Sequence, residues 1–480
     1  MTCLGGCRGI KNPYVNGQGI KFVGTLFMKA YFIRRFMLVP ITLLGVTLIV
    51  FALTRFMPGS PVERAMQQAA QAGDESSKGA AGSRENQGGM SDEQAEELEE
   101  EYGYDKPVMV AYFQWLGLWK RERLQSKGGF EKGGEDVIGD SKVEDFERET
   151  ILVLKGDGRQ VKVNWDGEDV GSAKAVYVDN GKSVTDKGWS VRVETPGERQ
   201  ERWARRMKSD VSEAPPYAHR AVVFKSRFSG LVQGDLGNSI TYQDKVIDMI
   251  LQRIPIALYF GLLSTVIIYG VCIPLGVLKA IKHRTPMDNI SSILVFVGYS
   301  IPGFSLGAVL LVYLGARAGW FPLFGLVSPD FYEMSTWAQV KDLAHHTVLP
   351  LMCYVVGGFA VTTMMMKNNL MDNLAADYVR TAVSKGVGFK KAVFGHAFRN
   401  SFIPIATSLG HLVSIFVGGS MLVEKVFDIQ GFGLLQFQSI IGRDQPVIMG
   451  TLAIAAFLMV LGNILSDIIV AMIDPRIKFH

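Results

Sequence analysis

Residues that could do chemistry are sparse in this chain, and the first to consider are its four cysteines. They stand at positions Cys3, Cys7, Cys272 and Cys353. The CxxxC spacing of Cys3 and Cys7 has no second ligand pair and no histidine nearby, so it lacks the usual pattern of a zinc site. No GxxxxGKS/T loop, which would hold phosphates, occurs in the sequence. The sequence therefore predicts no metal site and no phosphate-binding loop on this chain.

Three features within apolar stretches are candidates for a substrate path, and each also has a simpler interpretation. Asp467 lies inside a long apolar segment, where a charge is a functional candidate, but it is close enough to the segment's end to be solvated or paired. Pro302 would kink its helix, for packing or for gating. The neighbouring Gly303 and Gly307 form a GxxxG pair that permits close helix packing. Met364 opens a run of three methionines that could line a path or contact lipid.

The most informative polar stretch, residues 373–404, combines small, aromatic and basic residues. It predicts a short helix, a turn at Gly386 to Gly388 and a second helix leading into an apolar segment, because glycine readily adopts the positive φ that ends a helix. Such a surface suits docking into a groove on another protein. From the residues alone, a connector that its charge merely holds on one side of a membrane is an equal alternative.

The elements that must position these residues are apolar helices. Of the 480 residues, 48% are hydrophobic, and they are concentrated near the N-terminus and over most of the C-terminal half, with charged residues crowded between. A helix needs about 20 largely apolar residues to cross a bilayer, and it satisfies its own backbone hydrogen bonds there. Six segments meet this requirement: Phe36–Phe56, Ile254–Leu278, Ile290–Leu314, Val348–Met366, Phe402–Val423 and Val447–Ile473.

The charges between these segments predict the orientation in the membrane. Six basic residues and no acidic ones precede the first segment. The loop after the second segment carries Lys279, Lys282 and Arg284 against Asp288, and the loop after the fourth, which includes Lys367, is also mainly basic. The loops on the other face hold more acidic than basic residues. Basic loops stay in the cytoplasm, so both termini are expected there, and the long polar stretch after the first segment is expected outside.

The 373–404 stretch resembles the coupling loop of binding-protein-dependent ABC importer permeases, in the form typical of the dipeptide and oligopeptide branch. The family's general pattern has Glu-Ala-Ala before the glycine; here Arg380-Thr381-Ala382 stands in that place, as is common in the peptide branch. The residues that fill the family's positions, and that are the predicted ATPase-coupling residues, are Tyr378, Arg380, Thr381, Ala382, Lys385, Gly386, His396, Arg399, Asn400 and Pro404.

Other stretches also look like landmarks of this family. The resemblance covers residues 31–119 and 228–480, and within the branch it is strongest to the B-type permeases of microcin C and oligopeptide importers, partly through the acidic residues 91–102. The landmark stretches are Gly59-Ser60-Pro61, Tyr104-Asp105-Lys106-Pro107, Gly234 to Ser239, Glu424-Lys425-Val426-Phe427 with Gly431 and Gly433, Arg443-Asp444-Gln445-Pro446 and Asp474-Pro475-Arg476.

This resemblance implies a fold, partners and a mechanism. The fold would be the six-helix type I ABC importer permease in the bacterial inner membrane, surrounded by lipid, with no catalytic residue and no cofactor on this chain. A second homologous permease would complete the path for a peptide or peptide-like substrate, which a periplasmic binding protein would deliver. Two cytoplasmic subunits would bind ATP and Mg²⁺. Their closure would swing the helices between inward-open and outward-open states through the 373–404 loop.

The domain plan follows from these expectations. Residues 1–35 would be cytoplasmic, residues 36–56 would form the first membrane helix, and residues 57–253 would lie in the periplasm. Residues 254–480 would form helices two to six, with the coupling loop at residues 367–401.

The resemblance lapses in the periplasmic region, where a β-rich insertion is expected at about residues 120–227. A linker rich in Gln, Ala, Gly and Ser precedes it at residues 65–90, and Ser91 with Gln94 could form a capping box on an acidic helix, Asp92–Glu100. Four stretches have strand composition and are separated by turn signals: 150–154, 161–165, 175–178 and 189–193. The insertion could dock a binding protein, or it could be a decoration without a role in transport.

Two other classes of function remain as alternatives. A secondary transporter would need ion-binding residues in mid-membrane and repeated spans, and neither is visible in the sequence. A membrane scaffold displaying the β module would leave the 373–404 loop unexplained. The net charge of +4 is too small to indicate a nucleic-acid partner.

Overall fold

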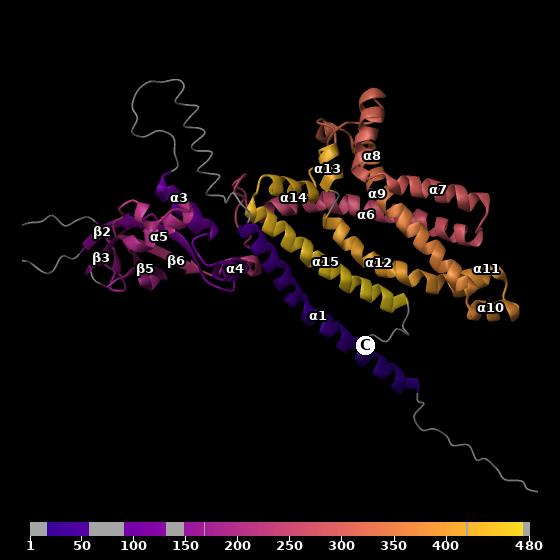
Figure 1. Ribbon diagram of the computed structural model, residues 1–480, viewed down its shortest axis with the longest axis horizontal. Helices are drawn as coiled ribbons and strands as arrows, with labels where there is room; N and C mark the ends of the chain where they lie inside the picture. Colours follow the sequence, from indigo (N-terminus) through magenta and orange to yellow (C-terminus); the bar gives the residue numbers. More distant parts are fainter. Residues whose placement is uncertain (1–16, 57–90, 131–147, 168, 419–420, 474–480) are drawn as a thin grey trace, which may run out of the picture. The chain divides into compact units, whose positions relative to one another are not determined.

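The computed structural model describes residues 17–56, 91–130, 148–167, 169–418 and 421–473 (Figure 1). Its contacts divide the chain into two compact units, residues 1–56 with 238–480, and residues 57–237. The first is helical and the second contains all the named strands. The predicted linker 65–90 and the landmarks Gly59-Ser60-Pro61 and Asp474-Pro475-Arg476 lie outside the described residues.

Among the described residues of the helical unit, four helices are long and apolar enough to cross a membrane. They are α1 (Gly17–Phe56), α6 (Val246–Ile281), α9 (Thr336–Ala375) and α15 (Gln445–Ile473), and in α1 the qualifying part is Ile33–Phe56. They contain the first, second, fourth and sixth predicted spans. The chain is thus predominantly helical, with several helices that could span a membrane.

The third predicted span is not one straight helix. Helix α7 (Pro286–Ser300) and helix α8 (Gly303–Leu310), which continues as a π-helical turn, meet at a 90° bend (Figure 1). Proline has no N–H and disfavours a helical residue before it, and Ile301 before Pro302 is extended, with φ −97° and ψ 118°. The sequence predicted a kink at Pro302, whereas the structure has a right-angled turn.

The GxxxG pair after this bend serves close packing. A Cβ on Gly303 would lie 2.7 Å from the backbone oxygen of Cys353 in α9, and a Cβ on Gly307 would lie 3.0 Å from the ring of Phe427. The distance at Gly303 leaves no room for a side chain, and the distance at Gly307 is tighter than an ordinary contact, so glycine at both positions allows α8 to lie close to its neighbours.

The end of the helical unit is built from shorter helices. Helix α12 (Phe398–Gly418) covers most of the fifth predicted span, which continues across the undescribed residues 419–420 into α13 (Met421–Phe427). Helix α14 (Phe432–Ile441) then leads through a turn into α15.

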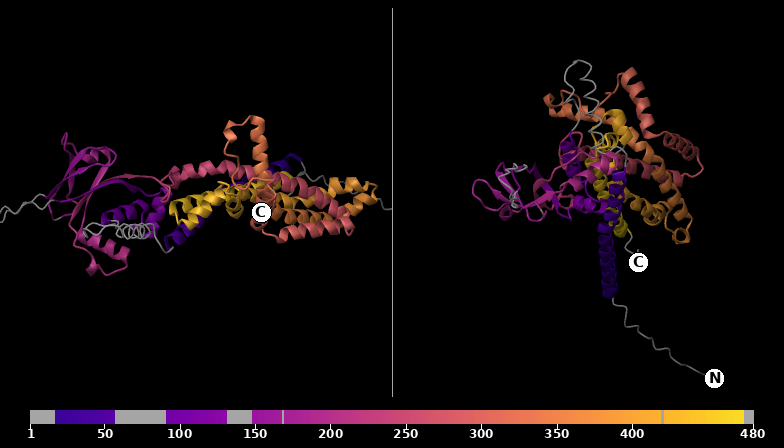
Figure 2. Two further views of the ribbon diagram at one scale, coloured as in Figure 1. Left: turned by 90° about the horizontal axis from the view of Figure 1, so that it is seen from above. Right: turned by 60° about the vertical axis from the view of Figure 1, so that its left-hand side comes forward.

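In its described residues, the second unit holds two antiparallel sheets of three strands each, in the orders β1-β6-β5 and β2-β3-β4. The strands appear in purple to magenta in Figure 2. The strands are β1 (Arg121–Gly129), β2 (Arg148–Val153), β3 (Gln160–Trp165), β4 (Lys174–Tyr177), β5 (Trp189–Glu194) and β6 (Arg220–Arg227). The four stretches of strand composition lie mainly in β2 to β5, and β1 and β6 are additional.

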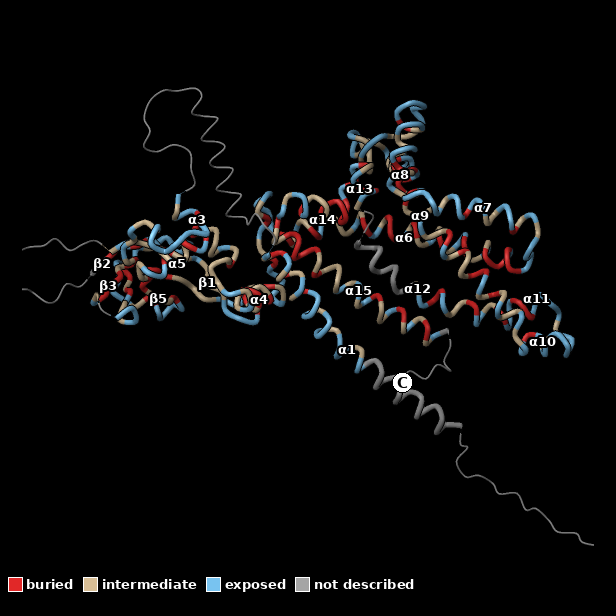
Figure 3. Tube along the Cα trace, viewed as in Figure 1, coloured by how far each residue is buried: buried red, intermediate tan, exposed pale blue. Residues whose placement is uncertain are grey.

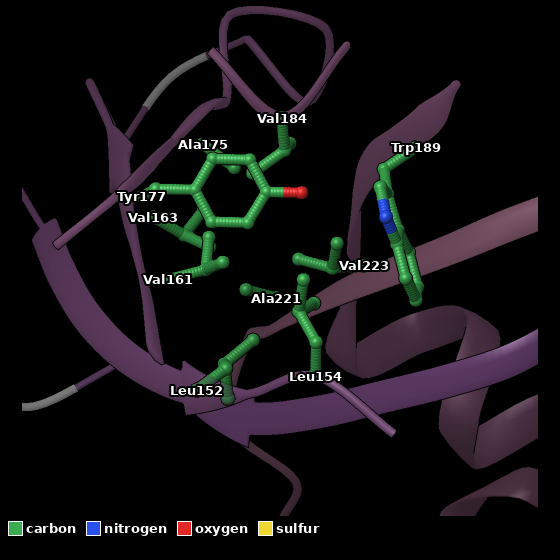
Figure 4. Packing of buried hydrophobic residues seen from close by; sticks show 10 residues of the cluster. All are labelled: Leu152, Leu154, Val161, Val163, Ala175, Tyr177, Val184, Trp189, Ala221 and Val223. Carbon is green, nitrogen blue, oxygen red and sulfur yellow. The ribbon is translucent and has the colours of Figure 1, made fainter. Parts of the chain in front are cut away.

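One hydrophobic core joins the two sheets (Figure 4). In β3, Val161 and Val163 point inward at alternate positions, as the pleat of a strand requires, and both are fully buried. Ala221 and Val223 do the same in β6, and Trp189 closes the core from β5.

The described part of this unit also contains the helices α3 (Asp92–Tyr102), α4 (Val108–Leu116) and α5 (Pro196–Met207). The capping box predicted for α3 is confirmed. The hydroxyl of Ser91 accepts a hydrogen bond from the backbone N–H of Gln94 at 3.2 Å, and the Gln94 side chain accepts one from the Ser91 N–H at 3.0 Å.

Candidate functional site

The stretch that the sequence singled out forms a helical hairpin, which we call the 377–400 hairpin. Helix α10 (Asp377–Ser384) is followed by a turn, α11 (Phe389–Ala392) and a π-helical turn that enters α12. Gly386 has φ +88°, a left-handed conformation that glycine adopts without strain. The predicted order of helix, glycine turn and helix is confirmed.

One side of the hairpin is buried in the helical unit. Val379, Ala392, Val393 and Ala397 are all at most 4% exposed. They belong to a core cluster that also contains the following residues of α6, α9 and α12: Val277, Ala280, Met366, Leu370 and Ile405. The hairpin is therefore packed against three long helices and cannot move without disturbing that cluster.

The other side of the hairpin is exposed, as the pale blue parts of α10 and α11 in Figure 3 show. It mixes apolar with cationic groups. Val383, Phe389 and Phe394 are 44%, 56% and 58% exposed. The exposed basic residues around them are Arg380, Lys385, Lys390, Lys391, His396 and Arg399. Large aromatic groups and arginine are the residues that most often anchor protein interfaces, so this side has the composition of a docking surface.

Two of the predicted residues close the base of the hairpin. The Tyr378 hydroxyl donates to the side-chain oxygen of Asn373 at 2.6 Å, and the amide of Asn400 donates to the Tyr378 hydroxyl at 3.2 Å. Ser401 reinforces this closure by donating to the backbone oxygen of Asn369 at 3.1 Å. Asn373 and Ser401 were not predicted as site residues. The sequence feature that could have indicated them is a polar side chain close to an apolar segment.

The remaining predicted site residues are scattered. Thr381 is exposed, Ala382 is half-buried and Pro404 lies exposed within α12. Pro302 stands at the α7–α8 bend, and Met364 is half-buried in α9.

Asp467 has a defined partner in the helical unit. Its carboxylate lies 3.1 Å from the Nε of Arg35, which joins α15 to α1. Burying a charge is costly unless it is paired, so the pair accounts for a carboxylate within an apolar helix.

A buried carboxylate explains the landmark around Glu424. Glu424 is fully buried, and it accepts hydrogen bonds from the backbone N–H of Leu434 at 2.7 Å and from the Tyr354 hydroxyl at 3.0 Å. It thereby caps the start of α14, where unpaired N–H groups favour a negative charge. A Cβ on Gly431 would lie 2.5 Å from the carboxylate, so this landmark glycine makes room for the cap.

A second buried carboxylate joins two landmarks that lie far apart in sequence. Asp444, before α15, accepts hydrogen bonds from the Ser239 hydroxyl at 2.5 Å and from the backbone N–H groups of Ile240 and Thr241 at 3.2 and 3.0 Å. The segment that leads into α6 is therefore held against the start of α15. This role fits a structural landmark better than a reactive group.

The β-rich unit is held together by buried ion pairs. The carboxylate of Glu194 lies 2.6 Å from Arg220 Nε and 3.0 Å from Arg202, and Arg220 also reaches Glu96 of α3 at 2.6 Å. Burial alone would raise the pKa of Glu194, but Arg202, Arg220 and Arg192 lower it to about 2.

The same unit contains a cavity of about 540 Å³ between α3 and β1. Both signs of charge line it, and several of these charges pair with each other, as Lys127 does with Glu100 at 2.5 Å. Lys155 of the lining likewise pairs with Glu97, so part of the charge in this cavity is matched within the lining itself.

The fold thus combines several helices that could span a membrane with a hairpin whose exposed side is rich in cations. Residues 272–479 match the family described as binding-protein-dependent transport system inner membrane component. The chain is 37% identical over 252 residues to the peptidoglycan transport system permease protein YejB of Agrobacterium fabrum, covering 52% of this chain and 69% of the relative. It is 38% identical to an inner membrane ABC transporter permease protein YejB of Escherichia coli O157:H7, with the same coverage. It is 36% identical over 250 residues to the oligopeptide transport system permease protein AppB of Bacillus subtilis, and this match covers 52% of this chain and 78% of the relative.

The chain belongs to this family of inner-membrane transport components. The family that the 373–404 stretch predicted is confirmed. Membership, together with several apolar helices, makes the chain a multi-pass permease subunit of an inner-membrane ABC transporter.

Proposed function

We propose that this chain is one of two permease subunits of an ABC importer for peptides or peptide-like substrates, and that the 377–400 hairpin couples it to the ATPase. The hairpin carries the proposal, because one side shares a core with α6, α9 and α12 while the other exposes Phe389 and Phe394 among cations. Peptide cargo is supported by relatives whose names specify peptidoglycan or oligopeptide transport.

The mechanism would be rigid-body coupling. Two cytoplasmic subunits would bind and hydrolyse ATP with Mg²⁺, and one of them would hold the exposed side of the hairpin in a cleft. Because the hairpin's buried side packs in one cluster with three long helices, movement of the cleft would turn those helices as a group. A second permease and a periplasmic binding protein would complete the transporter.

We propose six spans, with α7 and α8 together forming the third and α12 with α13 the fifth. Both termini would be cytoplasmic, and the domain plan given above would hold, with residues 57–253 in the periplasm. Trp320 and Tyr332 of the loop between α8 and α9, and Trp337 at the start of α9, are 66%, 88% and 79% exposed, which supports a membrane–water interface at this end of the third and fourth spans. Tryptophan and tyrosine gather at membrane–water interfaces.

A secondary transporter has less support. Asp467, its best candidate for an ion relay, is paired with Arg35. The β-rich unit keeps two interpretations, docking of the binding protein and a decoration without a transport role.

The test is whether the exposed side of the hairpin recruits the ATPase. Phe389→Ser and Phe394→Ser together should abolish copurification of the ATP-binding subunits and substrate uptake. Phe324→Ser is the matched control, because Phe324 is 59% exposed on the α8–α9 loop; it should leave copurification intact. Unchanged copurification in the hairpin double variant would overturn the proposal.

A further inference from the structure

A buried ionic cluster joins three helices of the helical unit. Asp288 at the start of α7 accepts two hydrogen bonds from the Lys367 ammonium of α9, at 2.7 and 2.8 Å. The Lys279 ammonium of α6 lies 3.2 Å from the same carboxylate. The side chains of Lys279, Asp288 and Lys367 are 0%, 3% and 9% exposed. The sequence suggested charges in solvated loops, and the structure buries them instead.

The polar groups of this cluster are well satisfied. Lys279 also donates to the backbone oxygen of Asp288 at 2.9 Å and to the hydroxyls of Ser291 and Ser292, each at 2.8 Å. The backbone N–H of Arg284 donates to the carboxylate at 3.1 Å. His283, half exposed, approaches the same carboxylate at 3.3 Å. Two buried lysines therefore share one buried aspartate.

A buried ionic cluster of this kind adds little net stability to a fold. Removing charges from water costs several kcal/mol per ion, and apolar residues of similar volume often stabilise as well or better. Buried ionic groups are better suited to fixing one particular arrangement of helices.

The ionic cluster fixes the helices on which the 377–400 hairpin packs. We call the residues of α6, α9 and α12 that bury the hairpin the hairpin seat: Val277, Ala280, Met366, Leu370 and Ile405. Val277 and Ala280 beside Lys279, and Met366 beside Lys367, belong to the core cluster that buries the hairpin. Helices α6 and α9 run together there so closely that a Cβ on Gly276 would lie 2.8 Å from the backbone oxygen of Thr363. The ionic cluster and the hairpin seat therefore occupy the same end of these helices.

Helix α7 depends on this cluster for its attachment. Of its 15 residues, only Asp288 and Val295 are buried, and Figure 3 shows the helix mostly exposed. Asp288 is thus the main buried polar link from α7 to both α6 and α9.

We infer that Asp288, through Lys279 and Lys367, is a positioning residue for energy coupling: it binds α7 to the hairpin seat so that a displaced hairpin moves α7 and α8 together with α6 and α9. This inference rests on the proposed function of the hairpin. Without the link, the hairpin would still dock its partner and ATP would still be hydrolysed, but α7 and α8 would not follow.

The experiment compares uptake with hydrolysis in the complete transporter, reconstituted in vesicles with its ATPase, second permease and binding protein. In Asp288→Asn, ATPase copurification should persist and uptake per ATP hydrolysed should fall at least tenfold. Asp372→Asn, which changes an exposed carboxylate of α9, is the control and should keep the ratio. An unchanged ratio, or uptake and hydrolysis falling in parallel, would overturn the inference.

A second variant guards against poor folding of Asp288→Asn. Lys367→Met removes the bridge to α9 but leaves Lys279 to balance the carboxylate, so the net charge of the buried cluster falls from +1 to zero and no charge is left unpaired. The same fall in uptake per ATP is expected, and an unchanged ratio contradicts the inference.

A cross-link between α7 and α9 tests whether Asp288→Asn acts by releasing α7 or by damaging the fold in general. Gly298 of α7 faces Val356 of α9, with 3.4 Å between a Cβ at Gly298 and a methyl of Val356. Gly298→Cys with Val356→Cys, oxidised in the Asp288→Asn background, should restore uptake per ATP, and reduction should abolish the rescue. Absence of rescue despite a formed cross-link would count against positioning. Loss of ATPase binding by the unaltered protein would instead refute the proposed function.

Discussion

The 377–400 hairpin and the β-rich unit bury their residues in different ways. The hairpin buries one side against long helices and leaves Val383, Phe389 and Phe394 exposed. The β-rich unit has a continuous core between two sheets, and its buried carboxylate Glu194 is matched by arginines of the same unit. We expect the exposed apolar groups of the hairpin to meet a partner, whereas the buried charge of Glu194 is already paired within the β-rich unit.

The largest expected effect falls on the stability of the β-rich unit. Arg220→Met leaves Glu194 and Glu96 buried with one partner fewer, and breaking such a pair costs about 3–5 kcal/mol. Thermal unfolding of the full-length protein in detergent should show this unit melting earlier, with ATPase copurification retained. Arg159→Met, which removes a partly exposed pair with Asp157, should lower the melting temperature of this unit much less, because solvent screens such a pair. Equal effects of the two variants would contradict this account of the unit.

Lowering the pH should destabilise the β-rich unit. The pKa of Glu194 is lowered from 4.5 to about 2, so its ionised form stabilises the fold above pH 4.5. That contribution is lost as the pH falls from 4.5 through 2. Hydrogen exchange in β5 and β6 of the full chain should therefore accelerate over this range. In Glu194→Gln, exchange should already be faster at neutral pH and should depend less on acid; an unaltered pH dependence would be the contrary result.

The turn of the hairpin should be sensitive where its backbone is left-handed. Gly386→Ala places a side chain at φ +88°, which costs about 1–2 kcal/mol. Uptake should fall several-fold while the protein remains folded. Gly388→Ala provides the comparison, because Gly388 has φ −58°, which alanine adopts freely. Similar losses in both variants would show that the turn conformation is not the cause.

The smallest effect is expected at the base of the hairpin. Tyr378→Phe removes the hydroxyl that joins Asn373 and Asn400, a contribution of about 0.5–1.5 kcal/mol. Hydrogen exchange at the start of α12 should quicken modestly. Tyr332→Phe, at a hydroxyl that is far more exposed, should leave that exchange unchanged. If the two variants did not differ, the Tyr378 hydroxyl would not help to hold the base of the hairpin.

Local signals in the sequence predicted much of this structure. Gly386 marked the hairpin turn, and Ser91 with Gln94 marked the start of α3. Runs of apolar residues located α1, α6, α9 and α15. Each of these signals acts within a few residues or along a single helix.

Long-range packing set the features that the sequence did not predict. The close approach of α8 to α9 after the bend depends on Gly303 lying against the backbone of Cys353. Strand β1 is rich in polar residues and glycine, and it becomes a strand only by pairing with β6, almost a hundred residues later. Asp288 and Lys367 are 79 residues apart, so neither reveals that the other will be buried against it.

The central claim is that the exposed side of the hairpin lies in a cleft of the ATPase. A photo-crosslinking amino acid placed at position 394 of the complete transporter tests this directly, with position 324 as the comparison. The account predicts a cross-linked product with the ATP-binding subunit from position 394 and none from position 324. A product from position 324, or none from position 394, would contradict it.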